Sequence, residues 1–114
     1  MKEFCEKCGR ANEKWETGKT FNGLDEHHNP PKHLFEWIGE VWKGETYTLC
    51  RNCHTGNEGL HPKIIIPLML KWSGLLRRCN SEFWIAKQMS PDIIRKCRNE
   101  IFIESKKWVE DGNT

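Results

Sequence analysis

Two cysteine pairs are the clearest candidates for chemistry in this sequence. Cys5 and Cys8 form one Cys-X-X-Cys pair, and Cys50 and Cys53 form a second pair much later in the chain. Two intervening residues let the chain turn so that both sulfurs of a pair face one ion, and four thiolates make a closed tetrahedral zinc site. Closing a long loop in this way lets metal binding contribute to folding. The pattern therefore predicts a structural zinc ion.

The string CRNCH, residues 50–54, admits a second interpretation. It also fits the Cys-X-X-Cys-His pattern of covalent c-type haem attachment. Haem attachment would leave Cys5 and Cys8 without a role, and it normally accompanies export, for which the N-terminal string MKEFCEKCGR gives no signal. Zinc accounts for all four cysteines and is favoured.

Four histidines lie beside the cysteine pairs or the elements that lead into them: His27, His28, His54 and His61. His54 directly follows the last zinc cysteine, so the zinc site would fix its backbone. Neutral imidazole binds metal ions, and its ordinary pKa of about 6.5 suits a general base at neutral pH. His33 begins the next segment and is expected at the surface.

The elements that must position these residues are short in the first half of the chain. A strand is expected over residues 20–28, ended by Asn29-Pro30-Pro31, because proline removes ladder donors. An apolar stripe predicts a helix of about three turns within residues 31–44. A second strand over residues 46–49 leads into Cys50, and a short helix is expected to begin near Arg51 and to end by Gly59.

The second half of the chain reads as helices. One is expected over residues 63–78, one from a Ser81 cap through Met89, and one from Ser90-Pro91-Asp92 onward. The last helix should bury Ile94, Cys97, Ile101 and Trp108 on one side, and Cys79 and Cys97 are explained as small apolar side chains. We expect one domain, with a core over residues 1–62 and a helical extension over residues 63–114 packed on it.

Two strings together resemble a known family. LDEHHNPP, residues 24–31, and TLCRNCH, residues 48–54, look like the strand, loop, strand and helix start of an HNH endonuclease, and the cysteine pairs resemble those of zinc-stabilised phage and bacterial members. The similarity covers about residues 4–61. It implies an α+β fold: a small ββα-metal core stapled by a four-cysteine zinc site, with a C-terminal helical extension.

The resemblance also implies roles for single residues. His27 and His54 would bind one catalytic divalent ion such as Mg²⁺, and His28 would be the general base. Glu45 stands nine residues before His54, where the family has its central Asn, and an ionised Glu only accepts hydrogen bonds. Thr46 or Asn52 could brace the site instead, His61 is a possible further metal ligand, and Asp25 or Glu26 could hold the other nitrogen of a histidine.

The implied activity is hydrolysis of DNA phosphodiester bonds. We expect Lys32, Arg51, Lys63 and the tryptophan-rich segment between the strands to contact the substrate. The alternative is a catalytically weak or inactive zinc module that binds nucleic acid or a protein partner through exposed Trp37, Trp42, Trp72 or Trp84. The formal net charge of +2 does not distinguish the nuclease from the binding module. A field this weak suggests help from a protein partner, such as a terminase or a defence complex.

The location expected from the sequence is the cytoplasm of a bacterial or phage-infected host cell. No secretory leader is recognised at the N-terminus. The longest apolar run, residues 64–70, is interrupted by Pro67 and is far shorter than the ~20 residues of a membrane span. We therefore expect no membrane association.

Overall fold

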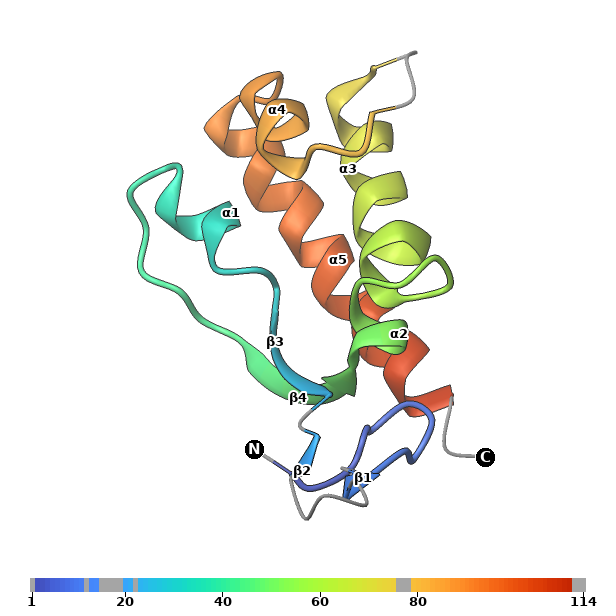
Figure 1. Cartoon of the computed structure of the whole chain (residues 1–114). Coiled ribbons are helices and arrows are strands. Elements are labelled where there is room, and N and C mark those ends of the chain that lie inside the picture. The colour runs from blue at the N-terminus through green and yellow to red at the C-terminus, as the bar shows by residue number, and fades with distance from the viewer. Residues whose placement is uncertain (1, 12, 15–19, 22, 76–78, 112–114) are drawn as a thin grey trace.

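The structure is a computed structural model of the 114-residue chain, and it describes residues 2–11, 13–14, 20–21, 23–75 and 79–111 (Figure 1). It is a small α+β fold in which a two-stranded hairpin lies beside a group of helices, with the N-terminal segment at one end. The two ends of the described chain both lie at that end of the molecule, on opposite sides of it (Figure 1).

The hairpin that carries the histidine pair consists of β3 (Leu24–Asn29) and β4 (Glu45–Cys50). The strands are antiparallel, with Leu24 opposite Cys50 and His27 opposite Tyr47. β3 ends before Pro30, as predicted, because proline offers no N–H to the ladder. The predicted strand over residues 20–28 is divided: β2 (Thr20–Phe21) pairs instead with β1 (Glu13–Lys14) in a separate small sheet, and residue 22 lies outside the described residues.

The segment between β3 and β4 is much less helical than its apolar stripe predicts. Only α1 (His33–Glu36) forms, so the expectation of a three-turn helix was wrong. Gly39 adopts a φ of 70°, a left-handed conformation that takes the chain out of the helix. Val41 is 84% exposed, so the second half of the stripe is not buried. Glu40 instead ties this segment to the last helix through ion pairs with Arg95 and Arg98.

The chain after β4 is helical with one interruption. α2 (Arg51–His54) is a single turn that begins at Arg51 and ends before Gly59, as predicted. A π-helix (His61–Ile65) leads directly into α3 (Ile66–Ser73). Gly74 ends α3 with a φ of 72°, ahead of the predicted end, and residues 76–78 lie outside the described residues. The early end has the same cause as at Gly39, since only glycine adopts this conformation readily.

The last two helices agree with the sequence signals. α4 (Glu82–Lys87) is capped by Ser81, whose side chain accepts a hydrogen bond from the backbone N–H of Trp84. α5 (Pro91–Asp111) begins at the predicted proline and runs the length of the molecule beside the hairpin and α3 (Figure 1). The α5 residues expected to be buried are Ile94, Cys97 and Ile101, which are, and Trp108, which is half-buried.

One apolar core joins the hairpin to the helices. Leu49 of β4 packs in the same cluster as Ile65, Met69, Ile85 and Ile101, and each of these is fully buried. Cys97 belongs to this core, where burial raises the pKa of its thiol to about 12, whereas Cys79 is half-buried. No helix in the described part of the chain has the length and apolar character needed to cross a membrane.

Two isoleucines on α5 offer a matched test of this core. Ile101 is fully buried, whereas Ile103 is 51% exposed. Truncating a buried isoleucine loses its transfer free energy and leaves a cavity, so Ile101→Ala should lower the free energy of unfolding by about 2 to 5 kcal/mol. Ile103→Ala should change it by less than about 0.5 kcal/mol. Urea titration measures both, and equal losses would contradict the placement of α5.

Candidate metal centres

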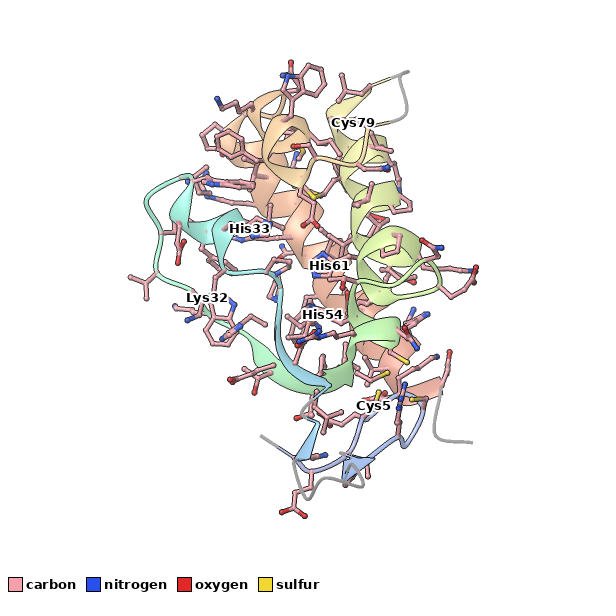
Figure 2. The ribbon with its side chains drawn as sticks, viewed as in Figure 1. Cys5, Lys32, His33, His54, His61 and Cys79 are labelled. Atoms are coloured by element: carbon pink, nitrogen blue, oxygen red, sulfur yellow. The ribbon has the colours of Figure 1, made fainter. Side chains whose placement is uncertain are left out.

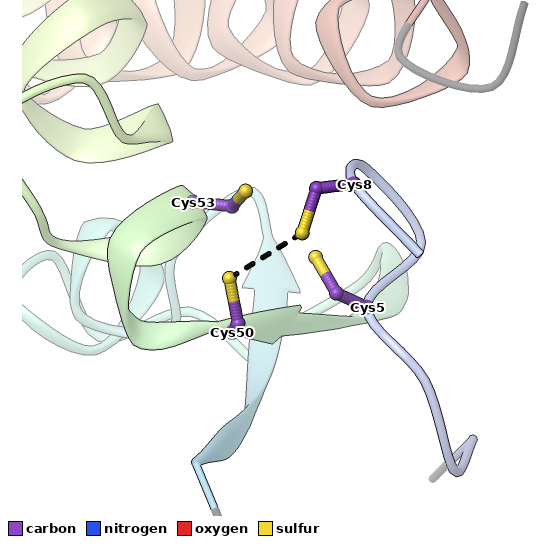
Figure 3. A group of neighbouring side chains, drawn as sticks. All are labelled: Cys5, Cys8, Cys50 and Cys53. Carbon is purple, nitrogen blue, oxygen red and sulfur yellow. Dashed lines mark hydrogen bonds between the residues drawn. The ribbon is translucent and has the colours of Figure 1, made fainter. Parts of the chain in front are cut away.

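The first cluster of possible metal ligands is formed by the four cysteines of the two pairs (Figure 3). Cys5 and Cys8 lie on the N-terminal loop, which turns back through Gly9, and Cys50 and Cys53 lie at the junction of β4 and α2. All four Sγ atoms lie within 4.8 Å of one another, and Cys8 Sγ and Cys50 Sγ are 3.7 Å apart. Two sulfurs bound at about 2.3 Å to a tetrahedral ion would be about 3.8 Å apart. This cluster could therefore hold a metal ion.

The electrostatics of the cysteine cluster also suit a cation. Burial works to raise the pKa of Cys5, but backbone N–H groups, those of Cys8 and Cys50 foremost, outweigh it and bring the pKa down to about 7. Burial raises the pKa of Cys53, and the neighbouring sulfurs raise it further. Four thiolates therefore cannot form together without a positive charge between them, and a coordinated metal ion supplies that charge.

A second cluster brings together His27 from β3, His54 from α2 and His61 from the π-helix. Figure 2 shows His54 and His61 in the middle of the molecule, between the hairpin and α3. The candidate ligand atoms lie within 4.8 Å of one another, and the ring centroids are 5.1, 5.3 and 4.8 Å apart. His27 Nδ1 and His54 Nε2 are 3.2 Å apart.

These distances fit three imidazoles around one ion. Nitrogens bound at about 2.0–2.1 Å to a tetrahedral ion would be about 3.3 Å apart, and the centroids of their rings would be about 5 Å apart. The three histidines therefore also could hold a metal ion. His61, the candidate extra ligand, lies in the cluster although α2 has already ended, because the π-helix brings it back beside His54.

Carboxylates hold the outer nitrogens of two of these rings. Asp25 Oδ2 lies 3.2 Å from His54 Nδ1, and Glu82 Oε2 lies 2.6 Å from His61 Nδ1. A carboxylate only accepts, so each Nδ1–H donates and each Nε2 keeps its lone pair. This fixes the tautomer that a metal ligand needs.

His27 is buried in a way that favours its neutral form. It is 2% exposed, and its Nε2 has no hydrogen-bond partner among the described residues. Burial lowers the pKa of His27 to about 3, and the nearby His61 and His54 contribute to the same shift. Burial also lowers the pKa of His54. Both imidazoles are therefore neutral at pH 7, which is the form that binds a metal ion.

The histidine cluster opens on one side into a cleft of about 780 Å³. His54, His61 and Glu82 line this cleft, so a ligand in it can reach two of the three rings. The other lining residues that the structure describes are Thr55, Asn57, Pro62, Ile66 and Asn80. Four sulfurs would fill all the coordination positions of a tetrahedral ion in the cysteine cluster. The histidine cluster would leave positions for exchangeable ligands.

His28 and Glu45 do not lie in either cluster. His28 follows His27 on β3 and faces the other way, with its ring centroid 5.1 Å from that of Trp42. Glu45 is exposed, accepts a hydrogen bond from the hydroxyl of Tyr47 at 2.8 Å and lies 3.4 Å from the ammonium of Lys106. The hydrogen bond from Tyr47 lowers the pKa of Glu45.

The proposed substrate contacts are all exposed but are not at the cleft. Lys32 lies beside α1, Arg51 begins α2, and Lys63 lies in the π-helix, where it pairs with Glu58 at 2.7 Å. Among the described residues that line the cleft, none is lysine or arginine.

The sequence did not identify Glu82, His33 or Asn29 as site residues. Glu82 contacts both His61 and His33. His33 was predicted at the surface but is half-buried. Asn29 is fully buried, and its side-chain amide donates to the backbone carbonyl of Phe102, which ties β3 to α5. These contacts join residues far apart in the sequence, and no local pattern signals them.

Comparison of the chain with protein-family models, with curated proteins and with solved structures gives no match.

The cysteine cluster has an internal control in Cys79, which lies outside it. Cys53→Ser should remove about one tightly bound metal ion per chain and lower the melting temperature, because metal binding contributes to folding. Cys79→Ser should leave both unchanged. Metal content by atomic emission and thermal unfolding by circular dichroism measure the two effects. Equal metal content in the two variants would contradict the assignment of this cluster.

Proposed function

We propose that this protein is a metal-dependent endonuclease of the HNH type that hydrolyses phosphodiester bonds in DNA. The observation that carries the proposal is a cluster of three imidazoles beside an open cleft, next to a separate cluster of four cysteines. An enclosed site serves structure, and a site with open positions serves chemistry.

The ion in the cysteine cluster is zinc in this proposal. Four thiolates at tetrahedral spacing are the donor set of structural zinc, and they leave no position for a substrate. Its part is to join the N-terminal loop to the start of α2, which carries His54.

A divalent ion, Mg²⁺ or another metal, belongs to the histidine cluster, where His27 and His54 hold it and His61 adds a third nitrogen. When bound, such an ion offsets the negative charge that builds on the phosphate and the leaving oxygen during hydrolysis. Asp25 and Glu82 keep the rings of His54 and His61 in the orientation that presents Nε2. The open side of the cluster leaves room for phosphate oxygens.

His28 is the general base that takes a proton from the attacking water. Its position beside His27 and its half-buried ring support this role. Because the two side chains leave opposite faces of the strand, the phosphate must lie across the outer edge of β3. In the described part of the chain β3 pairs with β4 alone, so no third strand occupies that edge.

DNA reaches the site across a surface without a strong positive field. Lys32, Arg51 and Lys63 are exposed cations that would contact phosphates away from the cleft, and such contacts position a duplex without reading its sequence. A protein partner, of the kind a terminase or a defence complex provides, would add the DNA affinity that a net charge of +2 does not supply.

A partner-binding module without catalysis is the second candidate, and an aromatic surface favours it. Trp37 and Phe83 contact each other edge to face, and they are 37% and 50% exposed. Trp84, beside Phe83 on α4, is 45% exposed. Exposed aromatic side chains are frequent at protein interfaces.

Nicking of supercoiled plasmid separates the two candidates. The zinc-loaded protein should nick DNA with at least one of Mg²⁺, Mn²⁺ and further Zn²⁺, each added in a separate assay. His54→Ala should abolish nicking because it removes a metal ligand, and His28→Ala should slow it by about 10² to 10⁴-fold because it removes a general base. Lys107→Ala, at an exposed position on α5, should nick like the native protein.

Two results of this assay contradict the proposal at different points. If no metal supports nicking although the protein keeps its zinc, the endonuclease assignment fails and the partner-binding candidate gains support. If His28→Ala nicks as fast as the native protein while His54→Ala does not, the metal centre stands and the base is wrongly assigned.

A further inference from the structure

We infer that Glu82 is a positioning residue of the histidine cluster, joined by His33, and that the cluster takes a transition-metal ion through three imidazole nitrogens. The inference rests on the geometry of the cluster and does not require nuclease activity. It gives the C-terminal helices and the segment between β3 and β4 a direct part in the metal centre.

Glu82 uses both carboxylate oxygens on histidines. Oε2 lies 2.6 Å from His61 Nδ1, and Oε1 lies 3.2 Å from His33 Nε2. Its side chain is 18% exposed, so the anion is largely withdrawn from water. Glu82 is therefore a largely buried carboxylate that bridges two imidazole rings beside the cluster.

This anion decides which nitrogen of His61 faces the cluster. Because Glu82 accepts from Nδ1–H, Nε2 of His61 carries the free lone pair. Asp25 does the same for His54 from within β3. The second contact of Glu82, with His33, limits how its carboxylate can turn. His33 begins α1 and Glu82 begins α4, so two separate segments are held at His61 by one side chain.

The donor set points to the class of metal. The three converging groups are imidazoles, and the nearby carboxylates are each engaged on an outer ring nitrogen. Mg²⁺ prefers six oxygen ligands in octahedral geometry. Imidazole nitrogen suits Zn²⁺, Ni²⁺, Co²⁺ and their neighbours. The separations of the rings also fit metal–nitrogen bonds of about 2.0–2.1 Å.

Titration with Co²⁺ tests both parts of the inference. The full chain is first loaded with one equivalent of Zn²⁺ to fill the cysteine cluster, and Co²⁺ binding is then followed by calorimetry and visible absorption. The native protein should bind one Co²⁺ per chain with a spectrum that lacks the strong thiolate bands of a cysteine site. An excess of Mg²⁺ should not displace it.

Three variants then separate positioning from stability. Glu82→Ala should weaken Co²⁺ binding by about 10- to 100-fold, the usual cost of losing an outer-shell partner. Glu82→Gln should restore part of the affinity, because its carbonyl oxygen can still accept from His61 Nδ1–H although it carries no negative charge. The matched control is Glu100→Gln, which removes a carboxylate that contacts Lys71 and Trp72 instead and should bind Co²⁺ like the native protein.

Several outcomes would overturn the inference. It fails if the native protein binds no second ion, if Mg²⁺ displaces Co²⁺, or if both Glu82 variants bind Co²⁺ as tightly as the native protein. If Glu82→Ala also loses its zinc through unfolding, Glu82→Gln decides: native-like Co²⁺ binding by a folded variant contradicts the role of Glu82, and weakened binding with zinc retained supports it. Loss of nicking with intact Co²⁺ binding would reject the endonuclease proposal alone.

Discussion

A single turn of helix, α2, holds together the two clusters on which the site depends. Cys50 and Cys53 turn toward the N-terminal loop, and His54, the next residue, turns toward His27 and His61. Adjacent residues on a helix point in different directions, so one turn can serve both clusters. Its position is set by the pairing of β4 with β3, which places Cys50 opposite Leu24 and brings His27 alongside. A structural change at either cluster that moves α2 therefore also moves ligands of the other cluster.

The helical extension is more than a cover for the hairpin. α5 packs against β3, and Asn29 fixes the end of that strand to the backbone of α5. α4 supplies Glu82 to the outer side of His61, and Glu40 ties the segment between the strands to two arginines of α5. The short hairpin and the one-turn helix could not hold three imidazoles in place without these long-range contacts.

The sequence was most informative where chemistry and local geometry coincide. The cysteine spacing predicted the first cluster, the prolines predicted the end of β3, and Ser81 and Pro91 predicted the starts of α4 and α5, because each signal acts within a few residues. The segment after Pro31 was predicted wrongly. The spacing of its apolar residues favours a helix of three turns, whereas Gly39, in a left-handed conformation, takes the chain out of the helix. Glu82 was not predicted and His33 was wrongly expected at the surface, because the contact between them spans 49 residues. The placement of His28 against Trp42 likewise depends on how the segment folds back, which no local pattern specifies.

Anomalous X-ray diffraction from crystals grown with zinc tests the central claim most directly, namely that one short helix serves two chemically different metal centres. We predict two anomalous peaks per chain, one among the four Sγ atoms of Cys5, Cys8, Cys50 and Cys53 and one bound by nitrogens of His27, His54 and His61. A single peak at the cysteines, or a second ion bound by the carboxylates of Asp25 or Glu82 rather than by the three imidazoles, would contradict it.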